Sequence, residues 1–466
     1  MKKNKKENIL YIIVLILFIG LTTMISLKHE YWADEANAWL IAKDSTLIEL
    51  FTKYLHTDGH PALFHLIIKF FQLFGLPYEG FRVIALLFSS LGVAFFLFKS
   101  NFKWYIKTII PFTYFIFYQY TVITRGYCLI LLLLSIIAIL WQKRKEKCFL
   151  FSLFLILLLS LESYTFLIAG SIYLIFIIDY IKDFLKTKKH NKKHLICLII
   201  IFLSFLITTI YVLPRGDNTF FPRLTTYYIS DSFVTVYNAS KTIKTIFSLA
   251  FFIFFFLLYK SIKDNKIRWE AAIIITPLLL YMEFGYCNLW HIGIFFLLIL
   301  FLAWIHNLNQ IKIFNIVLII SCFIQIYWSI NSSIYDYKST YSPAKDAAIF
   351  LKRQDYQNKK IVAHEFYETA INAYFDKNIF DNWHEQTRFF YWNTSNKYYD
   401  YSTKPEDLVK QNVDIYIVTP LYENIEFDKI RENYDEYIFK GSTYFETFKY
   451  ENMDVYIYIK KDNQEN

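Results

Sequence analysis

Glycine, proline and cysteine are all scarce in this chain of 466 residues, which contains 11, 9 and 5 of them. Membrane transporters usually interrupt their helices with glycine or proline near the bilayer midplane and carry an internal repeat. A lipid or solute transporter is therefore the weakest of the functional hypotheses. The cysteines show no metal-ligand spacing, and they lie in or beside apolar runs at Cys128, Cys148, Cys197, Cys287 and Cys322. None falls in the C-terminal part, which is compatible with an exterior location without disulfides.

Apolar residues are abundant by contrast. They make up 56% of the chain, aromatic residues make up 21%, and apolar runs recur from residue 9 to residue 330. A soluble protein has no core large enough to bury so much apolar surface, so the first two-thirds is predicted to be a polytopic helical membrane domain. The net charge of +9 comes mainly from lysines in short loops, where it indicates orientation and not a nucleic-acid partner.

These lysines predict the topology. The opening "MKKNKKENIL" leads into an apolar run with no evident cleavage site, which favours an uncleaved first span and a cytoplasmic N-terminus. Other lysine-rich loops, expected to be cytoplasmic, lie at 99–107, 142–147, 182–194 and 260–268. The intervening apolar blocks predict about eleven spans, at 9–27, 83–98, 108–124, 126–141, 148–162, 164–181, 195–213, 244–259, 271–286, 290–305 and 312–330.

One apolar segment does not fit this alternation. Residues 61–75 are short for a span and carry His65, Lys69 and Gln72 at spacings of three to four. We interpret the segment as a helix lying on or dipping into the outer leaflet, with these polar residues on one face. A short true span is the alternative.

The chain divides into a membrane domain at 1–333 and an extracytoplasmic α/β domain at 334–466. The second part is charged and has no long apolar run. "SPAKDAAIFLKR" predicts a helix with Ser342 as its cap and Pro343 in its first turn. "KIVAHE", "VDIYIVTP" and "MDVYIYIK" predict short strands, and an odd number of spans places this domain outside.

Ionisable residues gather at the predicted outer turns. The first outer loop, 28–60, holds six acidic residues against three lysines, and includes three histidines. Arg125, Glu162 and His291 each lie midway between two paired spans. A charge at bilayer depth costs about 2.5–3.5 kcal/mol unless it faces protein or water, so their convergence predicts a polar cavity that opens outward. Any one of these ionisable residues, taken alone, also fits a side chain that snorkels to the membrane–water interface.

Four stretches follow one another in an order and spacing that resemble a known superfamily: "WADEANAWLIAKD", "HTDGHPALFHLI", "GFRVIALLFSSLGVAFFLF" and "ITRGYCLILLLLSIIAIL". They resemble the GT-C membrane glycosyltransferases, in the branch of the protein O-mannosyltransferases and the lipid A aminoarabinose transferases. The resemblance covers about the first 180 residues, and beyond them only the layout is similar. It implies a helical bundle with juxtamembrane helices in the first outer loop, and inverting transfer from a polyprenyl-phosphate sugar to a glycan, lipid or protein. Where such families carry an arginine-tyrosine pair late in the bundle, this chain has "NLWHIG".

Such a transfer needs a base for the acceptor proton and cations for the phosphate. By its position in the resembled motif, Asp34 is the candidate base, and Glu35 would orient the acceptor or the first-loop backbone. Neighbouring helical residues point about 100° apart, so the two carboxylates must do different jobs. The alternative for Glu35 is a carboxylate that favours the helix N-terminus.

The candidate cations for the donor phosphate are His60, Arg82, Arg125 and His291. Arg125 is favoured because "TRGY" matches the family motif and a guanidinium binds phosphate with two parallel hydrogen bonds. Arg82 fits an interfacial anchor equally well. Asp58 and Glu162 are further candidates, and a solvated loop residue is the simpler interpretation of Asp58.

No cofactor is predicted. A divalent cation held by Asp34, Glu35, His60 and His291 is conceivable, but no ligand spacing requires one, so no metal is assigned.

A second enzymatic hypothesis is a polysaccharide polymerase or ligase that uses diphosphate-linked glycans. The polar loop at 214–243, with Arg215 and Arg223, keeps it open. The abundance of isoleucine, lysine, asparagine, phenylalanine and tyrosine is typical of AT-rich bacterial genomes, which places the chain in a bacterial plasma membrane.

Overall fold

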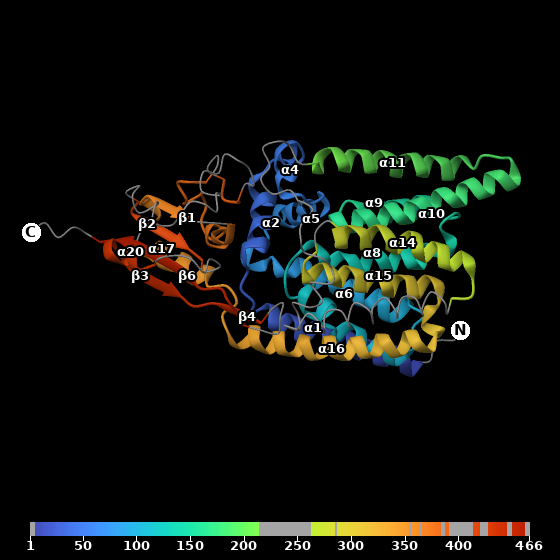
Figure 1. Ribbon diagram of the computed structural model, residues 1–466, viewed down its shortest axis with the longest axis horizontal. Helices are drawn as coiled ribbons and strands as arrows, with labels where there is room; N and C mark the ends of the chain where they lie inside the picture. Colours follow the sequence, from blue (N-terminus) through green and yellow to red (C-terminus); the bar gives the residue numbers. More distant parts are fainter. Residues whose placement is uncertain are drawn as a thin grey trace, which may run out of the picture.

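The computed structural model describes residues 5–213, 262–284, 287–353, 356–363, 366–383, 387–390, 413–419, 427–444 and 450–461. These residues are mostly helical, with short strands towards the C-terminus. Figure 1 shows a bundle of long helices with the N-terminus at one end and the strand-containing part at the other. The loop at 214–243 and the predicted span at 244–259 lie outside the described residues.

Among the residues that the structure describes, six helical segments are long and apolar enough to cross a membrane. They comprise α1 (Lys5–Ser26), α6 (Arg82–Lys99), α8 (Ile130–Leu140) with the 3-10 turns at its ends, α10 (Ser163–Thr187), α11 (Lys192–Val212) and α16 (Lys312–Lys338). Their outward faces are apolar. On α11, for example, Ile207 is 60% exposed and Ile210 is 68% exposed. Such a surface is unfavourable in water and is what a helical membrane protein presents to lipid.

The predicted count of eleven spans is not established by these helices. The apolar helix α9 (Cys148–Leu159) and the apolar segment Trp290–His306 of α15 (Leu289–His306) are shorter, and α14 (Asn265–Phe284) contains Pro277. The predicted span at 108–124 is not one continuous helix. It consists of the end of α7 (Trp104–Ile109), a 3-10 turn at Ile110–Phe112 and a π-helical turn at Phe115–Gln119. Pro111 has no N–H to donate, which explains the break.

The short segment predicted at 61–75 is a helix, α5 (Leu63–Leu73). Two of its polar residues bind α2 (Ala33–Asp44) and the residue that follows it. Gln72 Nε2 donates to the Trp39 carbonyl at 3.3 Å, and Lys69 Nζ donates to the Ser45 carbonyl at 2.5 Å. The polar face of α5 is thus used for packing against the first outer loop. Its position relative to the lipid stays a prediction.

The strand-containing part has a four-stranded sheet in the order β1-β2-β6-β3. The strands are β1 (Ile361–Ala363), β2 (Ile415–Val418), β6 (Val455–Lys460) and β3 (Tyr434–Phe439). β1 and β2 are parallel, whereas β6 is antiparallel to both of its neighbours. A separate antiparallel pair joins β4 (Ser442–Tyr444) to β5 (Tyr450–Asn452). The three predicted strands correspond to β1, β2 and β6.

In the described portion of this region, the sheet is accompanied by α17 (Ala344–Arg353), α18 (Thr369–Asn372) and α20 (Phe427–Asn433). α17 begins directly after Ser342 and Pro343, as the sequence predicts.

α2 lies between the bundle and the strand-containing part (Figure 1). Arg388 forms a two-point ion pair with Asp44 at the end of α2, with Nε 2.7 Å from Oδ2. The backbone N–H of Phe390 donates to Asn37 Oδ1 at 3.0 Å. The C-terminal part therefore contacts α2 both near its middle and at its end.

Gly92 allows α6 to approach α8 closely. A Cβ at this position would lie 2.9 Å from the backbone nitrogen of Leu132, whereas a Cβ at Gly20 on α1 has nothing within 4 Å. Because backbone cannot move aside cheaply, we expect Gly92→Ala to destabilise the protein by about 1–3 kcal/mol. Gly20→Ala is the matched control and should leave the thermal unfolding midpoint in detergent unchanged or slightly higher. Equal midpoints for the two variants would contradict this packing.

Candidate functional site

The first turn of α2 is fixed by Glu35, whose side chain has no solvent exposure. Its Oε2 accepts a hydrogen bond from the backbone N–H of Trp32 at 3.2 Å, which caps its own helix. Its Oε1 accepts from the backbone N–H of Thr124 at 2.6 Å. Glu35 thus joins the start of α2 to the segment that carries Arg125.

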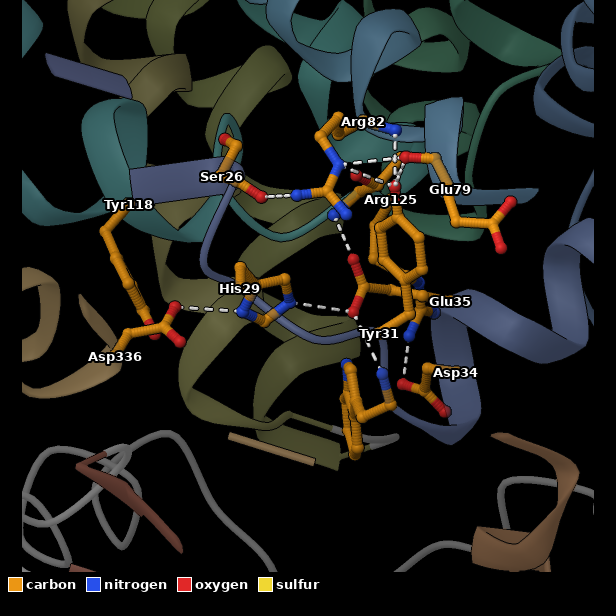
Figure 2. Close-up of polar contacts among 12 residues, drawn as sticks. Ser26, His29, Tyr31, Asp34, Glu35, Glu79, Arg82, Tyr118, Arg125 and Asp336 are labelled. Carbon is orange, nitrogen blue, oxygen red and sulfur yellow. Dashed lines mark hydrogen bonds and ion pairs between the residues drawn. The ribbon is translucent and has the colours of Figure 1, made fainter. Parts of the chain in front are cut away.

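His29 links the same carboxylate to the last turns of α16. Its Nε2 lies 3.0 Å from Glu35 Oε2 and its Nδ1 lies 2.9 Å from Asp336 Oδ2, and Figure 2 shows the ring between the two acids. The Tyr118 hydroxyl also donates to Asp336 Oδ2, at 3.0 Å. Burial alone lowers the pKa of His29, but the charges of Asp336 and Glu35 outweigh it and raise the pKa to about 10. His29 is therefore an imidazolium that donates to both carboxylates.

Asp34 has a different partner from its neighbour. Its carboxylate is ion-paired with Arg125 Nη1, and its side chain is 22% exposed (Figure 2). The guanidinium of Arg125 lies 5.6 Å from the centre of the Tyr127 ring. The angular offset between adjacent helical residues accounts for the two directions.

A second group of charged side chains comes from the turn after α4 (Leu55–Asp58) and from the start of α10. His60 Nδ1 lies 3.2 Å from Asp58 Oδ2, and His60 Nε2 lies 3.4 Å from Glu162 Oε2. His65 Nε2 is 3.5 Å from Asp58 Oδ2. Gly59 adopts the left-handed conformation, with φ of 73°, that brings His60 back towards Asp58.

The charges of this group determine its protonation. Burial opposes the charge on His60, but Glu162 and Asp58 raise its pKa to about 9. Burial also opposes the charge on Asp58, and His60 is the main group that lowers its pKa to about 2. Burial raises the pKa of Glu162, which the charges of His60 and Arg125 partly offset. His60 and Arg125 are thus two cations in one electrostatic cluster with Asp34, Asp58 and Glu162, and we call these five residues the charged cluster.

Gly126 is required for part of this geometry. A Cβ on it would lie 2.5 Å from Glu162 Oε1, so any side chain there would displace the carboxylate. The glycine of "TRGY" therefore lets the backbone beside Arg125 approach Glu162.

Two of the predicted phosphate cations have other partners. Arg82 donates from Nη1 to the Ser26 carbonyl, and from Nε to the Tyr31 hydroxyl at 3.0 Å and the Glu79 carbonyl at 3.1 Å. These bonds anchor the start of α6 to the end of α1 (Figure 2), which matches the alternative interpretation of Arg82.

His291 is buried, and its ring stacks on Tyr164 with 4.1 Å between centroids. Its Nδ1 accepts from the Asn288 backbone N–H at 2.9 Å. A nitrogen that accepts a hydrogen bond carries no proton, so this ring is not the imidazolium that phosphate binding was expected to use.

Among the residues that the structure describes, no group of three or more His, Cys, Asp or Glu side chains is arranged to hold a metal ion. The set considered from the sequence is divided, since Glu35 bonds to His29 and Asp34 to Arg125. The outward polar cavity stays a prediction.

No local sequence pattern indicates a functional role for His29, Asp336 or Tyr118. His29 and Asp336 are 307 positions apart, so no local pattern joins them. The available signal was an acidic residue near the end of an otherwise apolar helix, which is costly unless it is paired.

No protein-family model and no curated protein matches this chain. The fold defines the chain as a helical membrane protein with a small C-terminal sheet. The resemblance to the GT-C superfamily remains a prediction from the sequence.

The raised pKa of His29 makes stability depend on pH. The unfolded chain releases this proton near pH 6.5, whereas the folded protein holds it up to about pH 10. The contribution is therefore complete below pH 6.5 and is lost as the pH rises towards 10. We expect the thermal unfolding midpoint to fall over this range, and we expect His29→Gln to reduce that slope.

His29→Gln should also destabilise the protein at pH 7 by about 3–5 kcal/mol, because it leaves buried carboxylates without their counter-charge. His190→Gln, on the exposed turn between α10 and α11, is the control for an added glutamine. A His29→Gln protein with an unchanged slope would disprove the assignment.

Proposed function

We propose that this chain is an integral membrane glycosyltransferase of the inverting GT-C type. It would move a sugar from a polyprenyl-phosphate donor to an acceptor hydroxyl on the outer face of the membrane. The observation that carries the proposal is the pairing of Asp34 with Arg125 beside the cationic His60. A carboxylate base and two phosphate-binding cations are the groups that this reaction requires.

In the proposed reaction, Asp34 takes the proton of the acceptor hydroxyl as its oxygen attacks the anomeric carbon of the donor sugar. The new carbon–oxygen bond forms while the bond from that carbon to the phosphate oxygen breaks. The phosphate leaves with the electron pair and an additional negative charge. Arg125 and His60 stabilise this charge as it develops.

In the proposed reaction, Asp34 and Arg125 form their ion pair before the donor binds. A phosphate that enters the charged cluster competes with Asp34 for the Arg125 guanidinium, because both are oxyanions that fit its planar donor set. Once Arg125 binds the phosphate, the Asp34 carboxylate is available to accept a proton. Donor binding and activation of the base would thus be coupled through one side chain.

Glu35 acts on this chemistry indirectly, since its oxygens bind His29 and two backbone N–H groups. It is a positioning residue that fixes the first turn of α2. This assignment retains the sequence-based expectation that Glu35 orients the first-loop backbone and gives it no contact with substrate.

Asp34→Asn tests the base. The amide keeps the shape but accepts no proton, so we expect transfer from a purified lipid donor to fall by at least about 100-fold. Donor binding should be retained or tightened, because Arg125 loses its competing partner. Arg125→Ala should weaken donor binding and slow transfer together, since the phosphate is charged before and during the reaction.

Radiolabelled sugar transfer and donor affinity, measured on the same preparations, distinguish these two phenotypes. Lys145→Ala is the control, because it removes an exposed ion pair with Asp183 away from the charged cluster. An Asp34→Asn protein with near-normal turnover would remove Asp34 from the mechanism.

The proposed function also requires a topology in which the charged cluster faces outward. The N-terminus lies at the end of the bundle opposite the strand-containing part (Figure 1), which supports the predicted odd number of spans with the sheet outside. The lysine-rich turn between α10 and α11 would then be cytoplasmic.

Thiol labelling tests this orientation. All five native cysteines are buried, so an introduced cysteine gives the dominant signal. We expect Ser339→Cys to react with an impermeant reagent in intact cells, and Thr187→Cys to react only after permeabilisation. The opposite pattern would invert the topology and place the charged cluster on the cytoplasmic side.

A further inference from the structure

A groove of about 520 Å³ lies where the end of α16 meets the β4–β5 pair. It is distinct from the charged cluster. Eight residues line it: Tyr335, Ser339, Thr340, Lys440, Gly441, Ser442, Asn452 and Asp454. Its volume is within the range of sites that bind small molecules.

The walls of the groove are tied together by backbone hydrogen bonds. The Ser442 N–H donates to the Thr340 carbonyl at 2.9 Å, and the Met453 N–H donates to the Gly441 carbonyl at 2.9 Å. A Cβ at Gly441 would lie 2.5 Å from Pro343 Cδ, so the chain segments are in close contact there. The groove is therefore a preformed feature of the junction between the bundle and the sheet.

Its lining favours a polyhydroxylated ligand. Hydroxyl groups come from Tyr335, Ser339, Thr340 and Ser442, of which Tyr335 and Ser442 bond to each other. Asn452 supplies an amide whose Oδ1 accepts from the Asp454 N–H at 2.8 Å. Hydroxyl and amide groups both donate and accept hydrogen bonds, as sugar hydroxyls do. The tyrosine adds an aromatic surface to this set.

The charges in the groove argue against an anionic ligand. Lys440 Nζ lies 2.6 Å from Asp454 Oδ2, so its positive charge is already compensated. Asp454 is buried, and its Oδ1 also accepts from the Gly441 N–H at 3.0 Å. A phosphate site presents excess positive charge, whereas this pair adds none, so a neutral ligand fits better.

A second, much smaller cavity neighbours the groove. It has a volume of about 20 Å³, shares Asn452 with the groove, and includes Trp32 and Ala33 in its lining. These two residues immediately precede Asp34. The groove is therefore linked through Asn452 to a cavity that the segment before the proposed base helps to line.

We infer that this groove binds a neutral carbohydrate and that the carbohydrate belongs to the acceptor. The second part rests on the proposed function and narrows the acceptor to a neutral glycan. The first part stands on the groove alone.

Binding is tested on the full-length protein in nanodiscs by saturation-transfer NMR. The probes are maltose, cellobiose, lactose and chitobiose, with glucose 1-phosphate as the anionic comparator. We expect at least one neutral disaccharide to bind and the anionic sugar to bind more weakly. Ser339→Trp, which fills the groove, should weaken that binding about tenfold or more, as expected when several polar contacts are lost.

Thr340→Val removes one hydroxyl and keeps the shape of the groove. It should therefore weaken disaccharide binding less than Ser339→Trp does. Thr187→Trp adds the same bulk at the opposite end of the bundle and should leave binding unchanged. No binding by any neutral probe, preference for the anionic sugar, or full binding by Ser339→Trp would each overturn the proposal.

Separate experiments test carbohydrate binding in the groove and the role of that carbohydrate as acceptor. Asp34→Asn should retain disaccharide binding, since it leaves the groove intact. In the transfer assay, Ser339→Trp should raise the KM for the glycan acceptor and leave donor affinity unchanged. Binding that is lost in Ser339→Trp without any change in acceptor KM would keep the carbohydrate site and refute its role for the acceptor.

Discussion

The imidazolium of His29, held between Glu35 and Asp336, is the interaction on which the rest of the site depends. Its three ionised groups are all buried, and each would cost several kcal/mol there without its partners. The arrangement therefore tolerates little displacement of α1, α2 or α16, which meet at this point. Because Glu35 also binds the Thr124 N–H, the constraint extends to the segment that carries Arg125.

α2 is fixed at both ends by residues remote in the sequence. Thr124 donates its N–H to Glu35 in the first turn of α2, and Arg388 binds Asp44 at its last residue. A helix restrained in this way presents Asp34 in one orientation. Electrostatic stabilisation in a reaction depends on groups that are already in place, because no energy is then spent on arranging them. The structural contacts around α2 thus serve the proposed chemistry indirectly.

The sequence predicts the features that local pattern determines. These include the apolar helices, α5, the start of α17 and three strands of the sheet. It also predicts that Arg125, Glu162 and the first loop converge, because charges at the ends of apolar runs need partners. The predicted span at 108–124 is broken at Pro111. The proline is visible in the sequence, but the continuous apolar pattern around it favoured a single span. Arg82 and His291 were assigned from chain position, whereas their roles depend on carbonyl, hydroxyl and backbone partners that only the fold supplies.

The ion pair between Arg388 and Asp44 has a consequence for biosynthesis. Ribosomes make the chain from its N-terminus, so α2 is complete long before Asp336 and Arg388 exist. During that interval, His29 and Glu35 can pair with each other but lack Asp336, and Asp44 lacks the counter-charge of Arg388. α2 can therefore reach its final position only after the last long helix and part of the sheet have been added. A chain that stops early would keep every residue of the charged cluster and still lack the support that orients it.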